Sequence, residues 1–152
     1  MRRTPLVFGI LALAFPAAAF ASLGGTVSTV ETDRVQMKGA LVRIARNDAY
    51  TVHETLTPTG TTIREYYSSN GIVFGVAWDG EWPPDMRQLF GSYFEQYQRS
   101  VQAVRRIGRS RGRLAINDAG LVVNSIGHAR SFAGIAYAPA LMPAGVSADV
   151  IR

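Results

Sequence analysis

Residues 50–107 read YTVHETLTPTGTTIREYYSSNGIVFGVAWDGEWPPDMRQLFGSYFEQYQRSVQAVRRI, and this stretch decides the fold. Its first half contains three short runs of β-branched and aromatic residues, and a turn signal separates each run from the next. The runs are residues 50–56, 61–67 and 72–78. Such runs with intervening turns predict three antiparallel strands that follow one another in a sheet.

The first turn signal, residues 58–60, sets the register between the first two strands. Its proline presets φ and its glycine accepts a positive φ, so we expect a three-residue loop with a bulge. This register places His53 opposite Glu65. A slip by one residue would place Val52 opposite Glu65 instead and would move the side chains of the strand to the other face of the sheet.

The second turn signal, Asn70-Gly71, is typical of a two-residue hairpin. With that turn Tyr67 faces Phe74, and one face of the sheet becomes strongly apolar. The residues expected on that face are Ile63, Phe74, Val76 and Trp78. The opposite face carries more apolar residues than a solvated face needs, so we expect partial cover there as well.

A long amphipathic helix is predicted after the third strand. Pro84 suits a first helical position, because its missing N–H would have no partner there, and Asp85 is favourable near the positive end. Apolar residues then recur at steps of three and four, the period of a half-buried helix, until Gly108 ends it. We expect this helix, residues 85–107, to pack on the apolar sheet face. Its expected core residues are Leu89, Phe90 and Phe94.

Shorter signals outside this stretch complete a predicted α+β domain. Ser28 begins a capping-box pattern, which predicts a short N-terminal helix that ends near Lys38. Further strands are predicted at residues 40–45, 113–116, 121–126 and 131–138. We therefore expect an antiparallel sheet of about five or six strands with one long amphipathic helix on one face and a short N-terminal helix. The order of the strands stays open.

The N-terminus has the three parts of a secretory signal peptide. Arg2 and Arg3 precede an apolar run, and Ala19-Phe20-Ala21 has the small-residue pattern of a cleavage site. The apolar run is too short to span a hydrocarbon core of about 30 Å. We expect residues 1–21 to be removed, which leaves residues 22–152 as a single exported domain, periplasmic or secreted, with no transmembrane segment.

Composition excludes several function classes. The 152-residue chain has no cysteine, which excludes disulfides, thiol catalysis and cysteine-ligated metals. Its net charge of +5 is concentrated in residues 99–113, which contain no acidic residue. The arginines of this stretch are Arg99, Arg105, Arg106, Arg109, Arg111 and Arg113. They suit a polyanion, an anionic lipid surface or an acidic partner, and equally a solvated helix end that complements the helix dipole.

The sequence contains no motif that brings the residues of a catalytic site together. A phosphate loop, a dinucleotide fingerprint, an H-E-x-x-H pair and a nucleophile elbow are all absent from the sequence. Neither His53 nor His128 has another histidine at ligand spacing, so no metal or cofactor is expected. His53 and Glu65 suit either an acid–base couple or a partly buried ion pair between strands.

A small hydrolase based on His128 is a second enzymatic alternative. Ser92 or Ser125 together with Asp118 would complete a serine, histidine and aspartate set. Loose combinations of this kind occur in almost any chain. Catalysis is therefore less favoured than binding.

Several blocks resemble a family of small exported proteins of Gram-negative bacteria catalogued as a domain of unknown function. The blocks are residues 22–25, 50–54, 63–66, 73–78, 84–94 and 127–130, which span most of the expected mature chain. The resemblance implies export and a single domain. It carries no activity, substrate or cofactor.

Binding is the function that these patterns favour. We expect a non-catalytic envelope protein that binds a protein partner or helps to assemble or export one, with a small periplasmic hydrolase as the alternative. Trp and Arg are frequent at binding hot spots, so the expected contacts are the arginines of residues 99–113 and Trp82. Nucleic acid is disfavoured, because no aromatic residue lies among these arginines. An anionic surface is a further candidate partner.

Overall fold

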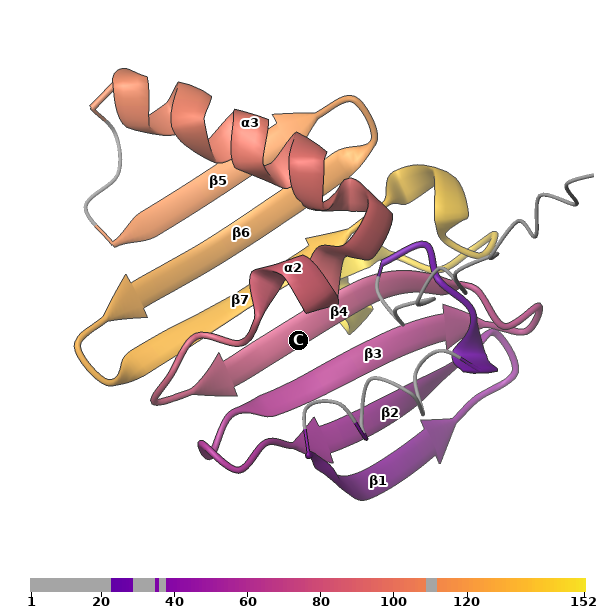
Figure 1. Ribbon diagram of the computed structural model, residues 1–152. Coiled ribbons are helices and arrows are strands. Elements are labelled where there is room, and N and C mark those ends of the chain that lie inside the picture. Colours follow the sequence, from indigo (N-terminus) through magenta and orange to yellow (C-terminus); the bar gives the residue numbers. More distant parts are fainter. Residues whose placement is uncertain (1–22, 29–34, 36–37, 109–111) are drawn as a thin grey trace, which may run out of the picture.

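The computed structural model describes residues 23–28, 35, 38–108 and 112–152, and within them seven antiparallel strands form one sheet (Figure 1). The strands are β1 (Ala40–Arg46), β2 (Tyr50–Leu56), β3 (Thr62–Ser68), β4 (Val73–Gly80), β5 (Arg113–Asp118), β6 (Leu121–His128) and β7 (Ser131–Tyr137). Their order is β1-β2-β3-β4-β7-β6-β5. The α+β class is confirmed, but the expected number of five or six strands was too low. Because β7 pairs with both β4 and β6, it joins the C-terminal strands to the N-terminal meander in the same sheet.

The register between β2 and β3 agrees with the bulged-loop prediction. His53 lies opposite Glu65, and Glu54 lies opposite Arg64. The backbone N–H of Thr57 donates to the carbonyl oxygen of Thr61 at 2.9 Å, which closes the loop. Gly60 has a φ of 82°, the conformation that glycine tolerates best.

The hairpin between β3 and β4 turns over three residues instead of the predicted two. The N–H of Ser68 donates to the Ile72 carbonyl at 3.0 Å, and the N–H of Gly71 donates to the Ser68 carbonyl at 2.8 Å. The extra loop residue shifts the pairing by one, so Tyr67 faces Val73. A bulge at the next position restores the predicted register, since Glu65 faces Val76 and Ile63 faces Trp78.

The bulge places Phe74 on the face opposite to the predicted one. Phe74 is fully buried there, in a cluster with Tyr66, Ala77 and Ile151. The helix-facing core otherwise contains its predicted members Val76, Trp78, Leu89 and Phe90, with Phe94 partly buried against them. The prediction for Phe74 was wrong because one inserted residue reverses the side-chain alternation of a strand.

The helical segment is bent rather than one straight helix. It consists of α2 (Met86–Phe90), a 3-10 turn η1 (Gly91–Tyr93) and α3 (Phe94–Arg106). Asp85 caps α2, because its carboxylate accepts the N–H groups of Arg87 at 2.9 Å and Gln88 at 3.2 Å. Gly91 has a φ of 46°, which interrupts the α conformation predicted for residues 85–107.

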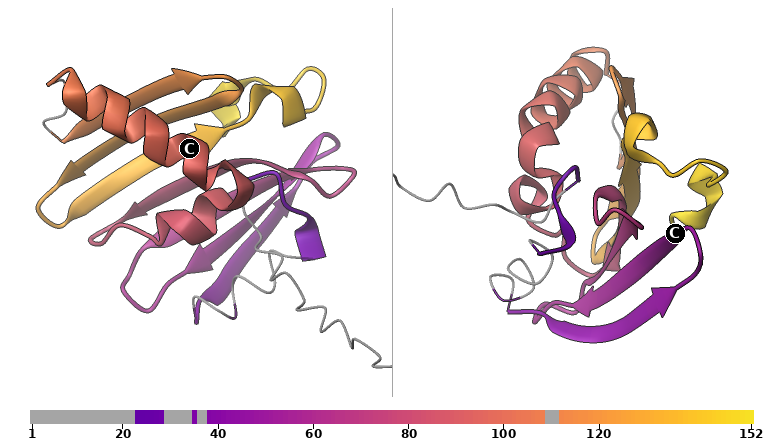
Figure 2. Two further views of the ribbon diagram at one scale, coloured as in Figure 1. Left: turned by 45° about the horizontal axis from the view of Figure 1, so that its top comes forward. Right: turned by 90° about the vertical axis from the view of Figure 1, so that its right-hand side faces the viewer.

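The segment after β7 covers part of the second face (Figure 2). It contains the 3-10 turns η2 (Pro139–Leu141) and η3 (Ala148–Val150). Ile151 packs above Gly75, where a Cβ would lie 2.6 Å from the Ile151 Cδ1, so glycine permits the close approach. The Tyr66 hydroxyl donates to the Arg152 carbonyl at 2.9 Å and accepts the Arg152 N–H at 3.1 Å. The expected partial cover of this face is therefore confirmed.

The described part of the N-terminal region lies beside β4. Leu23 is fully buried in the helix-side core, and Thr26 forms an isolated bridge with Ile72. Of the short helix expected from Ser28 to Lys38, Ser28 and Val35 are helical, and most of the rest lies outside the described residues. The expected signal peptide also lies outside them. In the described part of the chain, no helix is both long enough and apolar enough to cross a bilayer.

Candidate functional site

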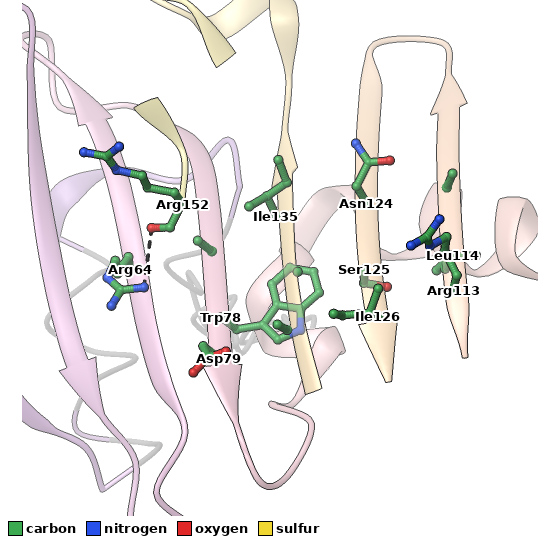
Figure 3. Close-up of a pocket in the computed structure, with 14 residues that line it drawn as sticks. Arg64, Trp78, Asp79, Arg113, Leu114, Asn124, Ser125, Ile126, Ile135 and Arg152 are labelled. Carbon is green, nitrogen blue, oxygen red and sulfur yellow. Dashed lines mark hydrogen bonds between the residues drawn. The ribbon is translucent and has the colours of Figure 1, made fainter. Parts of the chain in front are cut away.

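The second face of the sheet is open beyond the C-terminal segment, and its open part forms a groove over β4, β7, β6 and β5, here called the sheet groove. It has a volume of about 610 Å³. Figure 3 shows Arg64 and Arg152 at the β3 end, Arg113 at the β5 end, and Ile135 and Ile126 between them. A concave apolar surface with a few polar groups is the usual form of a small-molecule site.

Two rows of side chains that cross the strands form the floor of the sheet groove. The first row, from β3 to β5, is Arg64, Ala77, Ile135, Asn124 and Ala115. The second row, from β4 to β5, is Asp79, Ala133, Ile126 and Arg113. The small alanine side chains next to the isoleucines leave the space that forms the sheet groove. No sequence signal located this groove, because its rows form only when β7 lies between β4 and β6.

The charges at the two ends of the sheet groove differ. At the β3 end, the Arg64 Nε lies 2.6 Å from a Glu54 carboxylate oxygen, and its Nη1 donates to the Arg152 carbonyl at 3.4 Å. At the β5 end, Arg113 is exposed and makes no ion pair within the described residues. Arg113 therefore carries an unpaired positive charge at the β5 end of the groove, where none of the described lining residues of β5 and β6 is acidic.

A second candidate surface lies where α3 ends beside β5, and its small cavity is here called the α3 hollow. The hollow has a volume of about 270 Å³ and is lined by Val104, Ile107, Arg113 and Ala115. Ile107 is 68% exposed, although it is a large apolar side chain. Exposed Arg105 and Arg106 lie in the last turn of α3.

The structure brings together only some of the residues predicted to bind a partner. Arg113 joins the end of α3 at the hollow, and Arg99 is exposed one to two turns earlier. Arg109 and Arg111 lie outside the described residues. Trp82 is 56% exposed in the loop after β4. Three strand spacings, about 14 Å, separate β4 from β5, so Trp82 belongs to a different surface.

His53 and Glu65 lie opposite each other, as predicted, but inside a packed environment. The Tyr67 hydroxyl and the His53 Nε2 are hydrogen-bonded at 2.8 Å, and their rings meet edge to face at 4.9 Å. Glu65 is only 1% exposed. A substrate could not reach this carboxylate without opening the core, so the geometry favours a structural role for the pair.

The groups considered for a His128 hydrolase do not converge. His128 is exposed at the end of β6, whereas Asp118 pairs with Leu121 at its beginning, about 20 Å away along the strand. The Asp118 carboxylate instead accepts the Ser100 hydroxyl of α3 at 2.7 Å. Ser125 is three residues from His128 on β6 and points to the other face.

Metal ligands are not clustered in the described part of the chain, where no group of three His, Asp or Glu side chains could hold an ion. The pKa of Tyr97 is raised by burial, and Arg105 opposes that rise. Tyr97 is a packing residue of α3 and lines neither candidate surface.

A protein-family model matches residues 19–151, and its description is "Protein of unknown function (DUF2844)". No curated protein and no solved structure matches the chain.

Proposed function

Because this chain belongs to the family described as Protein of unknown function (DUF2844), its function has to be inferred from its own residues, and we propose that it is an exported, non-catalytic binding factor of the cell envelope. Its proposed partner is a protein with an acidic segment. The N-terminal signal pattern supports export. The end of α3 supports the choice of partner.

The observation that carries the proposal is an exposed apolar side chain among cations. Ile107 is 68% exposed at the α3 hollow, and Arg105 and Arg106 directly precede it in the chain. Arg113 lines the same hollow. An apolar anchor that fills a small pocket, with surrounding charges that steer the approach, is a common arrangement at protein interfaces. An acidic segment that carries one apolar side chain is complementary to this surface.

A protein segment fits this surface better than an anionic bilayer. Interfacial helices insert a broad apolar face into lipid. The apolar residues Tyr97 and Val101 of α3 instead pack against the sheet core, so they are not available for insertion. The hollow of about 270 Å³ accommodates a side chain rather than a lipid surface.

Site-directed photo-cross-linking in exporting cells tests the proposal. A photo-reactive side chain in place of Ile107 should cross-link to a partner, and mass spectrometry should locate the cross-link in an acidic segment. The same side chain in place of Ile44, which is 44% exposed on β1, is the matched control. Cross-linking at both positions, or at neither, would contradict the proposal.

Charge variants test the role of the arginines. Arg105→Gln with Arg106→Gln should reduce partner capture several-fold at 0.1 M salt, where exposed charges are screened over about 10 Å, and less at higher salt. Arg43→Gln with Arg46→Gln on the opposite edge strand is the control, since both residues are exposed on β1. Equal loss in both double variants would indicate nonspecific attraction by net charge.

Two further measurements separate the proposal from its alternatives. His53→Ala and His128→Ala should leave partner capture unchanged, whereas a hydrolase would lose its cellular function in one of them. Mass spectrometry of the exported protein should give an N-terminus at Ser22. An intact Met1 on cytoplasmic protein would exclude a role in the envelope.

A further inference from the structure

We propose that the sheet groove binds a single-chain anionic amphiphile, a molecule with one hydrocarbon chain and one carboxylate or phosphate head group. The head group would lie at Arg113 and the chain along the floor toward β4. This ligand site lies beyond the proposed capture of a partner protein. It uses the floor of the sheet groove and shares only Arg113 and Ala115 of the edge strand β5 with the α3 hollow.

The dimensions of the groove suit one hydrocarbon chain. Its volume of about 610 Å³ lies within the range of small-molecule sites. Four strand spacings separate β3 from β5, which gives a length of about 19 Å. The groove is two residue rows wide, and alanine and isoleucine lie side by side in the middle of each row. The site is therefore long, narrow and apolar.

The backbone beneath the floor favours a hydrocarbon over a peptide. Strands β4, β7 and β6 each pair with a neighbour on both sides, so their N–H and C=O groups are already used within the sheet. A peptide that crossed these strands would bring its own polar backbone groups onto alanine and isoleucine, where they would lack partners. A hydrocarbon chain brings no such groups. Among the floor residues between the charged ends, only Asn124 offers a polar side chain.

The distribution of charge places the head group at β5. At the β3 end, Arg64 is paired with the Glu54 carboxylate, and Asp79 lines the groove on the neighbouring strand β4. At the β5 end, none of the described lining residues that come from β5 and β6 is acidic. An anionic head group would complete a charge-assisted hydrogen bond at Arg113. An anion at Arg152 would also lie near the Glu54 carboxylate, because both residues line the hollow over β2 and β3.

Calorimetric titration of the purified, delipidated exported protein tests the site. The probes are octanoate, dodecanoate and hexadecanoate, with dodecyl phosphate as the phosphate comparator and dodecanol as the neutral one. Affinity should rise roughly threefold to fourfold for each added methylene until the chain fills the groove. Dodecanoate or dodecyl phosphate, whichever binds more tightly, identifies the head group, and both should bind more tightly than dodecanol.

Variants of the floor and of its two ends locate the binding. Ala133→Leu should abolish binding by filling the groove, whereas Ala103→Leu on the exposed side of α3 should leave it unchanged. Arg113→Gln should weaken binding of dodecanoate about tenfold, since hydrogen bonds to charged groups are the stronger ones. Arg152→Gln, at the other end of the same groove, should change the affinity less than twofold.

Three outcomes would overturn the proposal. These are an affinity independent of chain length, binding that survives Ala133→Leu, and equal effects of Arg113→Gln and Arg152→Gln. If no fatty acid bound, but an acidic helical peptide bound tightly and lost this binding in Ala133→Leu, the groove would be assigned to a protein segment instead. Failure of the partner proposal leaves these results unaffected, because Ala133 does not line the α3 hollow.

Discussion

The two faces of the sheet are buried by different kinds of structure. On one face, Phe90 of α2 stacks on Tyr97 of α3 with ring centres 4.4 Å apart and meets Trp78 edge to face at 6.3 Å. On the other face, Phe74 and Ile151 form a smaller cluster beneath an irregular C-terminal segment. A periodic helix covers its face with a continuous stripe of side chains. An irregular segment covers only what it reaches, and the sheet groove lies beyond it.

The largest expected effect compares buried phenylalanines on the two faces. Phe90 and Phe74 are both fully buried. Phe90→Ala should lower the free energy of unfolding by about 3 to 5 kcal/mol, because it leaves a cavity in the helix-side core. Phe74→Ala should cost a similar amount if the C-terminal segment packs as densely as the helix. Urea denaturation measures both, and a loss below about 1 kcal/mol for Phe74→Ala would show that the second face is loosely packed.

A smaller effect compares two adjacent residues of β7 whose side chains point to opposite faces. A Cβ at Gly134 would overlap the Trp78 indole and lie 2.7 Å from the Ser125 Cβ. Gly134→Ala should therefore destabilise by about 1 to 3 kcal/mol through overpacking, and near-ultraviolet circular dichroism should report the displaced tryptophan. Ala133→Val, which points into the sheet groove, should change stability by less than about 0.5 kcal/mol. Similar losses in both variants would mean that the groove is not open.

Tyr66→Phe tests how the hydrogen bonds between Tyr66 and Arg152 hold the C-terminal segment on the sheet. The variant removes the hydroxyl that donates to the Arg152 carbonyl and accepts the Arg152 N–H. The expected loss is about 1 kcal/mol, the usual net value of such hydrogen bonds. Hydrogen exchange should increase in residues 146–152 and stay unchanged in α3. A matching increase in α3 would show that the two faces unfold together.

The smallest effect concerns alkaline pH on the helix face. Burial raises the pKa of Tyr97, so the folded protein keeps the phenol proton to a higher pH than the unfolded chain does. The associated stability is present below the ordinary tyrosine pKa of about 10 and is lost as the pH rises through the folded value. Denaturation midpoints from about pH 9 to pH 11 should therefore fall less steeply in Tyr97→Phe than in the wild type. An identical slope would show that Tyr97 is solvated.

The helix face was more predictable from sequence than the groove face. The β2 and β3 register follows from the loop at Gly60, and the positions of Leu89 and Phe90 follow from local helical periodicity. The bulge at Phe74 depends on the loop that the next hairpin adopts. The bend at Gly91 arises because glycine accepts a φ of 46° in place of helical values.

Long-range contacts account for what the sequence did not show. The segment after Ala138 has no periodic pattern, and its position depends on Gly75 and Tyr66, which are more than sixty residues earlier in the chain. The groove floor likewise needs the pairing of β4 with β7. Local propensity contains no term for such distant pairings, so the groove follows only from the assembled sheet.

The three-residue turn at Gly71 and the bulge at Phe74 offset each other by one residue. Their combination constrains which insertions and deletions the chain tolerates. Loss of one residue between Tyr66 and Gly75 can be absorbed in two ways, by a two-residue turn that keeps the bulge or by a three-residue turn without it. Loss of one turn residue together with one bulge residue would restore a regular hairpin. Loop length and bulge should therefore be coupled during evolution, since relatives one residue shorter here should keep either the three-residue turn or the bulge, and relatives two residues shorter should have neither.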